Sequence, residues 1–507
     1  MLRAGETSGG PVPRGPGQAS QGAMAMPDDE DGTGTQLIER PFENPHANDP
    51  VLGPRYADGY KEGAFGDHTL DNNPAGEPGP AEDAFIEGFE DGIVRFGAFK
   101  KGFKRGITVG LDGATSDTLG PPAMGAEHAA DLSAAWLEGR EEGLKVARVV
   151  RDGIAEKALE SADFDQTSGP IHSMWVGVGR MYWREYQGGR AIFFIHPSGE
   201  AFTVDAPIYA EYEEIGGLRS QLGRPISDTT RVPDGRGKVT EFEKGTMYST
   251  ATTGAHEVHG LIGAKWKELG GPTGDLGYPT SNEQFERADR GKVNTFEHGD
   301  IYFWPNLGVQ VVRSIQVRYR GQNCFAESDE ASAQDETYVV ATAVGPSRDA
   351  TRSVRSRIFD VDAGGSFPDT MVVYQGPPAG IGALAVTMAE HDTGNPDEYR
   401  GQIEAGVRVA MNGLAAAIAA TGVGLTVSGI AVALANAGVG PIADAINDAI
   451  DSGDDTIGTA VFPLAPKALI GLARSPLQRE RDIEFHLATP LLTGEGAYKA
   501  YFDVTFG

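Results

Sequence analysis

Hydrophobic and polar positions alternate in different ways along the chain, and each pattern predicts a different region. Residues 1–50 combine few apolar positions with many Gly, Pro and acidic residues, which is typical of a disordered segment. Residues 51–165 carry aromatic and small residues at helical spacing, which predicts helices. Residues 170–312 hold short alternating runs between glycine turns, which predicts strands. Residues 313–507 contain further strand-like runs around an Ala/Gly-rich segment.

Glycines recur four residues apart in the helical region, as in Gly59 and Gly63 and again in Gly102, Gly106 and Gly110. Residues at positions i and i+4 lie on one helix face, so these glycines let two helix backbones approach closely. We expect either a helical hairpin packed on itself or an element that pairs with another chain. The charged residues between the glycines argue against a membrane-spanning interpretation.

A sequence repeat organises residues 170–312. One copy has LGRPISD from Leu222 and GKVTEFEKGTMY from Gly237, and the next has LGYPTSNE from Leu276 and GKVNTFEHGDIYFW from Gly291. Both motifs recur after 54 residues (276 − 222 and 291 − 237). A degenerate earlier copy includes GRAIFFIHPSGEAFTV. A unit this small cannot bury its own apolar face, so we expect the copies to stack on one another.

Together with GAHEVHGLIGAKWKELGGPTGDLGYPTS between them, these motifs resemble the LGFP repeat family of actinobacterial cell-wall-associated proteins. The LGFP motif itself reads LGRP and LGYP in this chain. The resemblance implies attachment to the arabinogalactan–peptidoglycan envelope. Cell-wall polysaccharide or peptidoglycan is then the expected partner, and the expected location is extracellular or cell-wall-associated. The resemblance also implies a propeller-like ring of repeats.

Aromatic and polar side chains of the repeats are the expected glycan contacts, because sugar rings stack their C–H faces on aromatic planes. The candidates are Trp266, Tyr278, His298, Tyr302, Trp304, Tyr248 and His256. The alternative is that Tyr248, Tyr302 and Trp266 form the core of the repeat. The segment HEVH does not have the spacing that puts two zinc ligands on one helix face.

Acidic residues cluster near the strands of the C-terminal region, where carboxylate oxygens are the ligands that Ca²⁺ prefers. The candidate calcium ligands are Asp329, Glu330, Asp335, Asp360 and Asp362. The alternative is that these are solvated loops of a very acidic protein. The sequence indicates no other cofactor.

Residues 409–443 contain no charged side chain, within the Ala/Gly-rich segment 404–450. One interpretation is two buried helices that pack through small residues. The other is a membrane hairpin that breaks near TGVG. Insertion into a membrane would make the protein a membrane-active effector or toxin that the repeats target to the envelope.

Composition narrows the choice of function. The 507 residues carry a net charge of −29, which disfavours binding to nucleic acid. The single cysteine, Cys324, allows no intramolecular disulfide and no Cys-based zinc site. The N-terminal residues do not read as a secretory signal, so a cytoplasmic location is the alternative to export. No nucleophile elbow, P-loop or dinucleotide fingerprint occurs, and an envelope hydrolase with an unrecognised site is a third functional hypothesis.

The sequence therefore predicts a multidomain α+β protein. It has a helical N-terminal region, a β-rich, propeller-like repeat module and a C-terminal β-sandwich-like domain with a helical insertion at 404–450. The expected function is non-catalytic binding to cell-envelope glycan.

Overall fold

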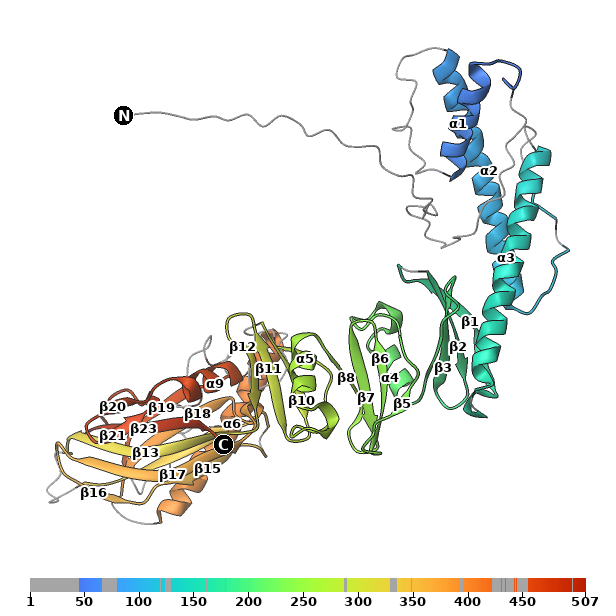
Figure 1. The fold of residues 1–507 in the computed structure, drawn as a ribbon. Helices are drawn as coiled ribbons and strands as arrows, with labels where there is room; N and C mark the ends of the chain where they lie inside the picture. Colours follow the sequence, from blue (N-terminus) through green and yellow to red (C-terminus); the bar gives the residue numbers. More distant parts are fainter. Residues whose placement is uncertain are drawn as a thin grey trace, which may run out of the picture. The chain divides into compact units, whose positions relative to one another are not determined.

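The chain forms two compact units, residues 1–203 and 204–507, in a computed structural model (Figure 1). The structure describes residues 45–65, 80–118, 120–123, 129–160, 162–177, 179–286, 290–328, 335–347, 349–391, 395–421, 455–494 and 496–507, with positions 430, 434, 442 and 444. The predicted disordered segment 1–50 lies almost wholly outside these residues. Each unit combines helices with antiparallel sheets, so the predicted mixed α+β class is confirmed.

Three helices open the first unit: α1 (Leu52–Phe65), α2 (Pro80–Leu111) and α3 (Ala129–Ala158). The regularly spaced glycines lie where these helices contact one another. A Cβ atom on Gly59 of α1 would lie 1.9 Å from the carbonyl oxygen of Phe85, and one on Gly102 of α2 would lie 1.9 Å from that of Trp136. Only glycine permits backbones this close. These two glycines therefore serve pairing between helices within the chain, which favours the predicted alternative of helices packed on themselves as in a hairpin.

An antiparallel sheet follows the helices in the first unit. Its strands, in spatial order, are β1 (Thr167–Trp175), β2 (Arg180–Tyr186), β3 (Arg190–His196) and β4 (Ala201–Val204). Helix α3 packs on β3, where a Cβ on Gly153 would lie 2.2 Å from the ring of Phe194. Strands β3 and β4 contain the degenerate early copy of the repeat, so that copy forms a sheet of the same connectivity as those described next.

The second unit begins with the two clear repeats, which we call repeat 1 (from Leu222) and repeat 2 (from Leu276). Repeat 1 follows helix α4 (Ile208–Glu214) and contains β5 (Thr230–Arg231), β6 (Gly237–Phe242), β7 (Gly245–Thr250), β8 (Gly254–His259) and helix α5 (Gly260–Glu268). Repeat 2 contains β9 (Gln284–Glu286), β10 (Gly291–Phe296), β11 (Gly299–Trp304) and β12 (Gly308–Val312). Each repeat forms a four-stranded antiparallel meander (Figure 1).

The propeller-like arrangement predicted for the repeats is wrong for the described residues, because their sheets do not close into a ring. The reason lies just after β12. A third copy would need a helix near residues 314–322, one step of 54 after α5, but the chain forms strand β13 (Ile315–Ala326) there. Val293, Tyr302 and Val312 of repeat 2 pack into the same core as β13. The C-terminal domain therefore covers the face on which another repeat would stack.

Two antiparallel sheets build the C-terminal domain. One has the order β17 (Ser366–Gly376), β13, β23 (Ala497–Phe506) and β22 (Leu487–Ala488). The other has the order β15 (Arg352–Arg355), β14 (Asp335–Val344), β18 (Ala383–Glu390) and β19 (Asp455–Pro463), with β16 (Phe359–Val361) also paired to β14. A hairpin of β20 (Gln478–Glu480) and β21 (Ile483–Phe485) and helix α9 (Pro466–Arg474) complete it. Both sheets and α9 contribute to one apolar core.

Helix α6 (Pro396–Thr421) begins the Ala/Gly-rich segment and packs on β14 and β15. Beyond Thr421, most of the uncharged stretch 409–443 lies outside the described residues. Three of its described side chains, Ile430, Leu434 and Ile442, are at most 1 % exposed and share a core with the second C-terminal sheet. These residues favour the buried-helix interpretation. Among the described helices, none combines the length and apolarity needed to span a membrane.

Candidate functional site

The same hydrogen bond fixes the Leu-Gly-x-Pro turn of both repeats. The Tyr212 hydroxyl of α4 donates to the carbonyl oxygen of Gly223 at 2.7 Å, and the Trp266 indole N–H of α5 donates to that of Gly277 at 3.0 Å. Gly223 and Gly277 have φ values of 71° and 70°, a left-handed conformation that favours glycine. Each repeat therefore begins on a turn that needs glycine and that the aromatic side chain of the preceding helix holds in place.

Aromatic packing makes the two repeats one body. The Trp266 ring lies 4.9 Å from Tyr248 of repeat 1 and 5.6 Å from Phe296 of repeat 2, measured between ring centroids. Tyr278 lies 6.4 Å from Tyr248 in the same core. A helix that ends one repeat thus fills the space between two sheets. This is the stacking of copies that the small size of the repeat predicts.

Most of the predicted glycan contacts belong to this packing. Trp266, Tyr278 and Trp304 are fully buried, Tyr302 is 1 % exposed and Tyr248 is 9 % exposed. Tyr302 and Trp304 stack on each other at 5.3 Å within the core shared with the C-terminal domain. These five rings offer no free face to a sugar in this conformation, which favours the alternative that they form the core.

The two predicted histidines lie nearer the surface but do not meet. His298 is exposed in the turn between β10 and β11. His256 is half-buried on β8, and its Nε2 atom lies 2.8 Å from the carbonyl oxygen of Thr253. Neither histidine lines the polar pocket described below. As glycan contacts they stay predictions.

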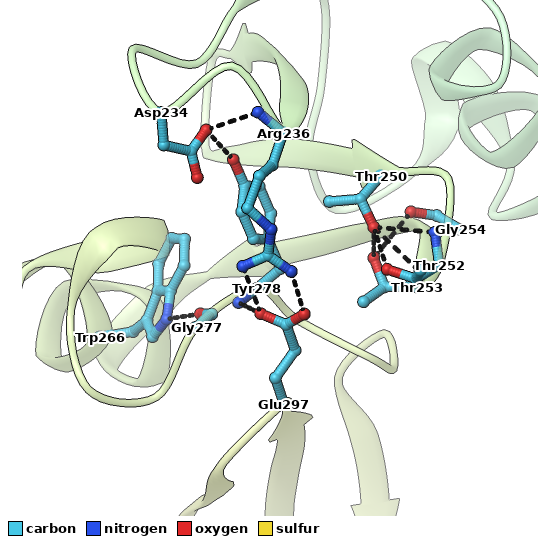
Figure 2. Close-up of polar contacts among 10 residues, drawn as sticks. All are labelled: Asp234, Arg236, Thr250, Thr252, Thr253, Gly254, Trp266, Gly277, Tyr278 and Glu297. Carbon is cyan, nitrogen blue, oxygen red and sulfur yellow. Dashed lines mark hydrogen bonds and ion pairs between the residues drawn. The ribbon is translucent and has the colours of Figure 1, made fainter.

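A polar clasp joins the β5–β6 loop of repeat 1 to repeat 2 (Figure 2). The Tyr278 hydroxyl donates to Asp234 at 2.7 Å, and the Arg236 guanidinium lies 5.1 Å from the Tyr278 ring centroid. Arg236 also donates to both carboxylate oxygens of Glu297, at 2.5 and 3.2 Å. Glu297 in turn accepts from the backbone N–H of Tyr278 at 3.0 Å. Arg236 holds the pKa of Glu297 below its usual range. The loop is thereby fixed before any ligand arrives.

Beside this clasp lies a cavity of about 280 Å³ on repeat 1. Its lining comes from the β5–β6 region (Arg231 and residues 235–238), the end of β7 (residues 249–251) and the segment before α4 (residues 206 and 207). Arg231 is exposed and is the cross-strand neighbour of Lys238. The cavity therefore combines guanidinium and ammonium donors from one hairpin with hydroxyl groups from the next strand.

Hydroxyl groups gather around Thr250, which lines the β7 end of the cavity. Thr250 Oγ1 lies 3.1 Å from Thr252 Oγ1 and 2.8 Å from Thr253 Oγ1, and it accepts from both backbone N–H groups, at 3.2 and 2.9 Å (Figure 2). These bonds fix the turn between β7 and β8. Hydroxyl groups both donate and accept, which suits the hydroxyls of a sugar.

Two of the three cations around the cavity are already paired. Lys238 bonds to Asp205 at 2.6 Å, and Arg236 bonds to Glu297. The pocket is therefore close to charge balance, although it belongs to a chain of net charge −29. Such a site favours a neutral ligand rich in hydroxyl groups over a polyanion.

Comparison with known families agrees with the repeat geometry. The model of the LGFP repeat matches residues 222–274 and 276–323. Residues 222–323 of this chain therefore hold two LGFP repeats. The second match ends within β13, so it includes the segment where a strand replaces the helix of the first LGFP repeat. The search of curated proteins found no match for the chain.

A second polar cluster joins the two LGFP repeats. His259 lies 2.6 Å from Glu257 and 3.3 Å from Glu283, and Lys292 bonds to Glu283 at 2.6 Å. Burial alone would lower the pKa of His259, but the two carboxylates outweigh that effect and raise it to about 9. His259 is therefore charged at neutral pH, and Glu257 and Glu283 are tied across the junction between the repeats.

The predicted calcium ligands do not gather into a visible site. Asp329 and Glu330 lie outside the described residues. Asp335 is 3 % exposed, and it accepts from the backbone N–H and the hydroxyl of Ser328 and from the Tyr498 hydroxyl. Asp360 and Asp362 are exposed. Within the described part of the chain, no three His, Cys, Asp or Glu side chains form a group suited to a metal. Calcium binding stays a prediction.

Sequence reasoning did not single out the pocket residues Arg231, Lys238, Ser249 and Thr250. A signal was nevertheless present in the alignment of the two LGFP repeats. Lys238 recurs as Lys292, whereas Arg231, Ser249 and Thr250 correspond to Phe285, Phe303 and Trp304. Equivalent positions at which the two repeats differ in residue type indicate where the two repeats differ in function.

Proposed function

We propose that this protein is a non-catalytic cell-envelope-binding protein, and that the polar pocket of its first LGFP repeat binds envelope glycan. LGFP repeats occur in cell-envelope-associated proteins, and both copies match the family. The observation that carries the proposal is the cavity of about 280 Å³ that a fixed loop and the hydroxyl-bearing residues Ser249 and Thr250 line. The proposed location is the cell wall or the extracellular space.

The chemistry of the pocket suits binding rather than catalysis. The Thr250 hydroxyl bonds to threonine hydroxyls and backbone amides, so no base activates it as a nucleophile. Arg231 and the paired Lys238 supply N–H donors, while the hydroxyl oxygens of Ser249 and Thr250 supply acceptors. A fixed arrangement of both kinds of group recognises a polyol without prior ordering of the site, which preserves affinity.

The membrane-effector hypothesis receives no support from the described part of residues 404–450, because Ile430, Leu434 and Ile442 lie in the core of the C-terminal domain. The hydrolase hypothesis receives none from the pocket. Binding to glycan through the LGFP repeats is therefore the function we propose.

The test is retention of the full chain on insoluble, purified actinobacterial cell wall. We expect the unaltered protein to co-sediment with the wall. We expect Arg231→Ala to weaken retention about tenfold, because it removes an exposed charged donor from the lining of the pocket. Thr250→Val should also weaken retention on the wall, because it removes a hydroxyl group from the lining of the pocket.

Arg313→Ala is the matched control. Arg313 is also an exposed arginine of the repeat module, but it pairs with Asp275 and does not line the pocket. It should leave retention unchanged. If the unaltered chain stays in the supernatant, or if Arg231→Ala and Arg313→Ala bind alike, the proposed function of the pocket is wrong.

A further inference from the structure

Repeat 2 presents a different surface at the position of the pocket. Arg231 and Lys238 are cross-strand partners in repeat 1, and Phe285 and Lys292 are cross-strand partners in repeat 2. The two lysines are also alike in their ion pairs, each 2.6 Å from a carboxylate. Phe285 therefore stands in the place of Arg231 on the same backbone frame.

Phe285 is unusually open for a phenylalanine, with 59 % of its surface exposed. It lies on β9, an edge strand of its sheet. Leu261, at the position equivalent to the pocket residue Pro207, is 58 % exposed. Phe285 and Leu261 are thus exposed apolar side chains at two positions whose counterparts in repeat 1, Arg231 and Pro207, line the cavity.

The surroundings of Phe285 fit a sugar better than a protein partner. Lys292 lies directly across the strand pair, and Arg290 is exposed in the turn that precedes β10. An aromatic plane with N–H donors at its edge binds a sugar by stacking on C–H groups and donating to hydroxyls. This is the chemistry first expected of the buried rings, now placed on an exposed one.

We propose that Phe285 forms an aromatic subsite on repeat 2, one repeat along from the polar subsite on repeat 1. The two subsites together select an extended polysaccharide over a short sugar. This inference rests on the proposed function, since both subsites serve one glycan. The Arg236–Glu297 clasp and the Trp266 core fix the two repeats to each other, so a chain that reaches both subsites gains the second contact at high effective concentration.

The test compares fragments of different length. Soluble arabinogalactan–peptidoglycan fragments, fractionated by size, are titrated against the full chain and its variants by calorimetry. We expect Phe285→Ala to weaken binding of long fragments about five- to tenfold and to leave binding of the shortest bound fragments unchanged. Phe285→Trp should restore the affinity for long fragments. Arg231→Ala should weaken binding at every length.

Leu491→Ala is the control for loss of an exposed apolar side chain, because Leu491 is 47 % exposed and lies in the C-terminal domain. It should bind every fragment as the unaltered chain does. If Phe285→Ala binds all lengths normally while Arg231→Ala does not, the aromatic subsite is wrong and the proposed function stands. If the unaltered chain binds no fragment, the proposed function fails and the subsite with it.

Discussion

Repeat 1 and repeat 2 have the same backbone frame but different side chains at the same places. Ser249 and Thr250 border a polar cavity in repeat 1, whereas their counterparts Phe303 and Trp304 are aromatic. The difference follows from what each copy packs against. Trp304 is fully buried in the core that repeat 2 shares with the C-terminal domain. Repeat 2 therefore has aromatic packing residues at the positions where repeat 1 has polar residues that line the cavity.

The junctions after the two repeats differ as well. Repeat 1 ends in helix α5 and a charged cluster that includes Glu257 and His259. At the equivalent positions repeat 2 has Val311 and Arg313, and the chain turns into a strand. Repeat 1 therefore packs against another repeat, whereas repeat 2 packs against the C-terminal domain.

The largest expected effect comes from Trp266→Ala, which removes the ring that fills the space between the two sheets. The loss of a fully buried tryptophan should lower the free energy of unfolding of the second unit by about 3–5 kcal/mol. Urea denaturation followed by circular dichroism measures this. Leu269→Ala, at the half-exposed end of the same helix, should cost less than about 0.5 kcal/mol. Similar costs for both variants would show that α5 does not join the repeats.

The charged junction of repeat 1 makes a prediction about pH. The pKa of His259 is raised from its unfolded value to about 9, so its contribution to stability is full below pH 6.5. It is lost as pH rises through 9, on the order of 3 kcal/mol in all. Urea midpoints measured between pH 6.5 and 9.5 should fall more steeply for the unaltered chain than for His259→Gln. Parallel curves would contradict the charged state of His259.

A smaller effect distinguishes the glycines of the two turns. A Cβ on Gly277 would lie 2.4 Å from Glu297, and one on Gly223 would lie 2.7 Å from Glu243. Both alanine variants suffer the left-handed φ, which costs about 1–2 kcal/mol. Arg236 holds Glu297, whereas Glu243 is exposed, so Gly277→Ala should cost about 0.5–1 kcal/mol more. Thermal unfolding of both variants checks this, and equal losses would mean that the clasp does not constrain Glu297.

The features that were predictable from the sequence are periodic. The stacked repeats, the mixed α+β class and the close packing of helices at glycine were all predicted from the spacing of residues. Spacing along the chain decides which residues share a face. The strand that follows the repeats was also predictable, because apolar and polar residues alternate in SIQVRYR after Val312 as they do in a strand.

The roles of individual aromatic residues were not predictable in the same way. Tyr278 or Trp304 would show the same sequence pattern as a sugar platform or as a core residue. The outcome depends on what packs next: α5 covers Tyr248 and the C-terminal domain covers Trp304. Phe285 could not be predicted as an exposed residue either. Its sequence context is that of an ordinary strand, and its exposure comes from its place on an edge strand.

The most direct test of glycan binding by the repeats is hydrogen–deuterium exchange of the full chain with and without soluble arabinogalactan–peptidoglycan fragments. Bound glycan should slow amide exchange in residues 231–238, 249–254 and 284–286, where the two subsites lie. Slowed exchange confined to residues 313–507, or no change in the repeats at a fragment concentration that saturates binding, would contradict it.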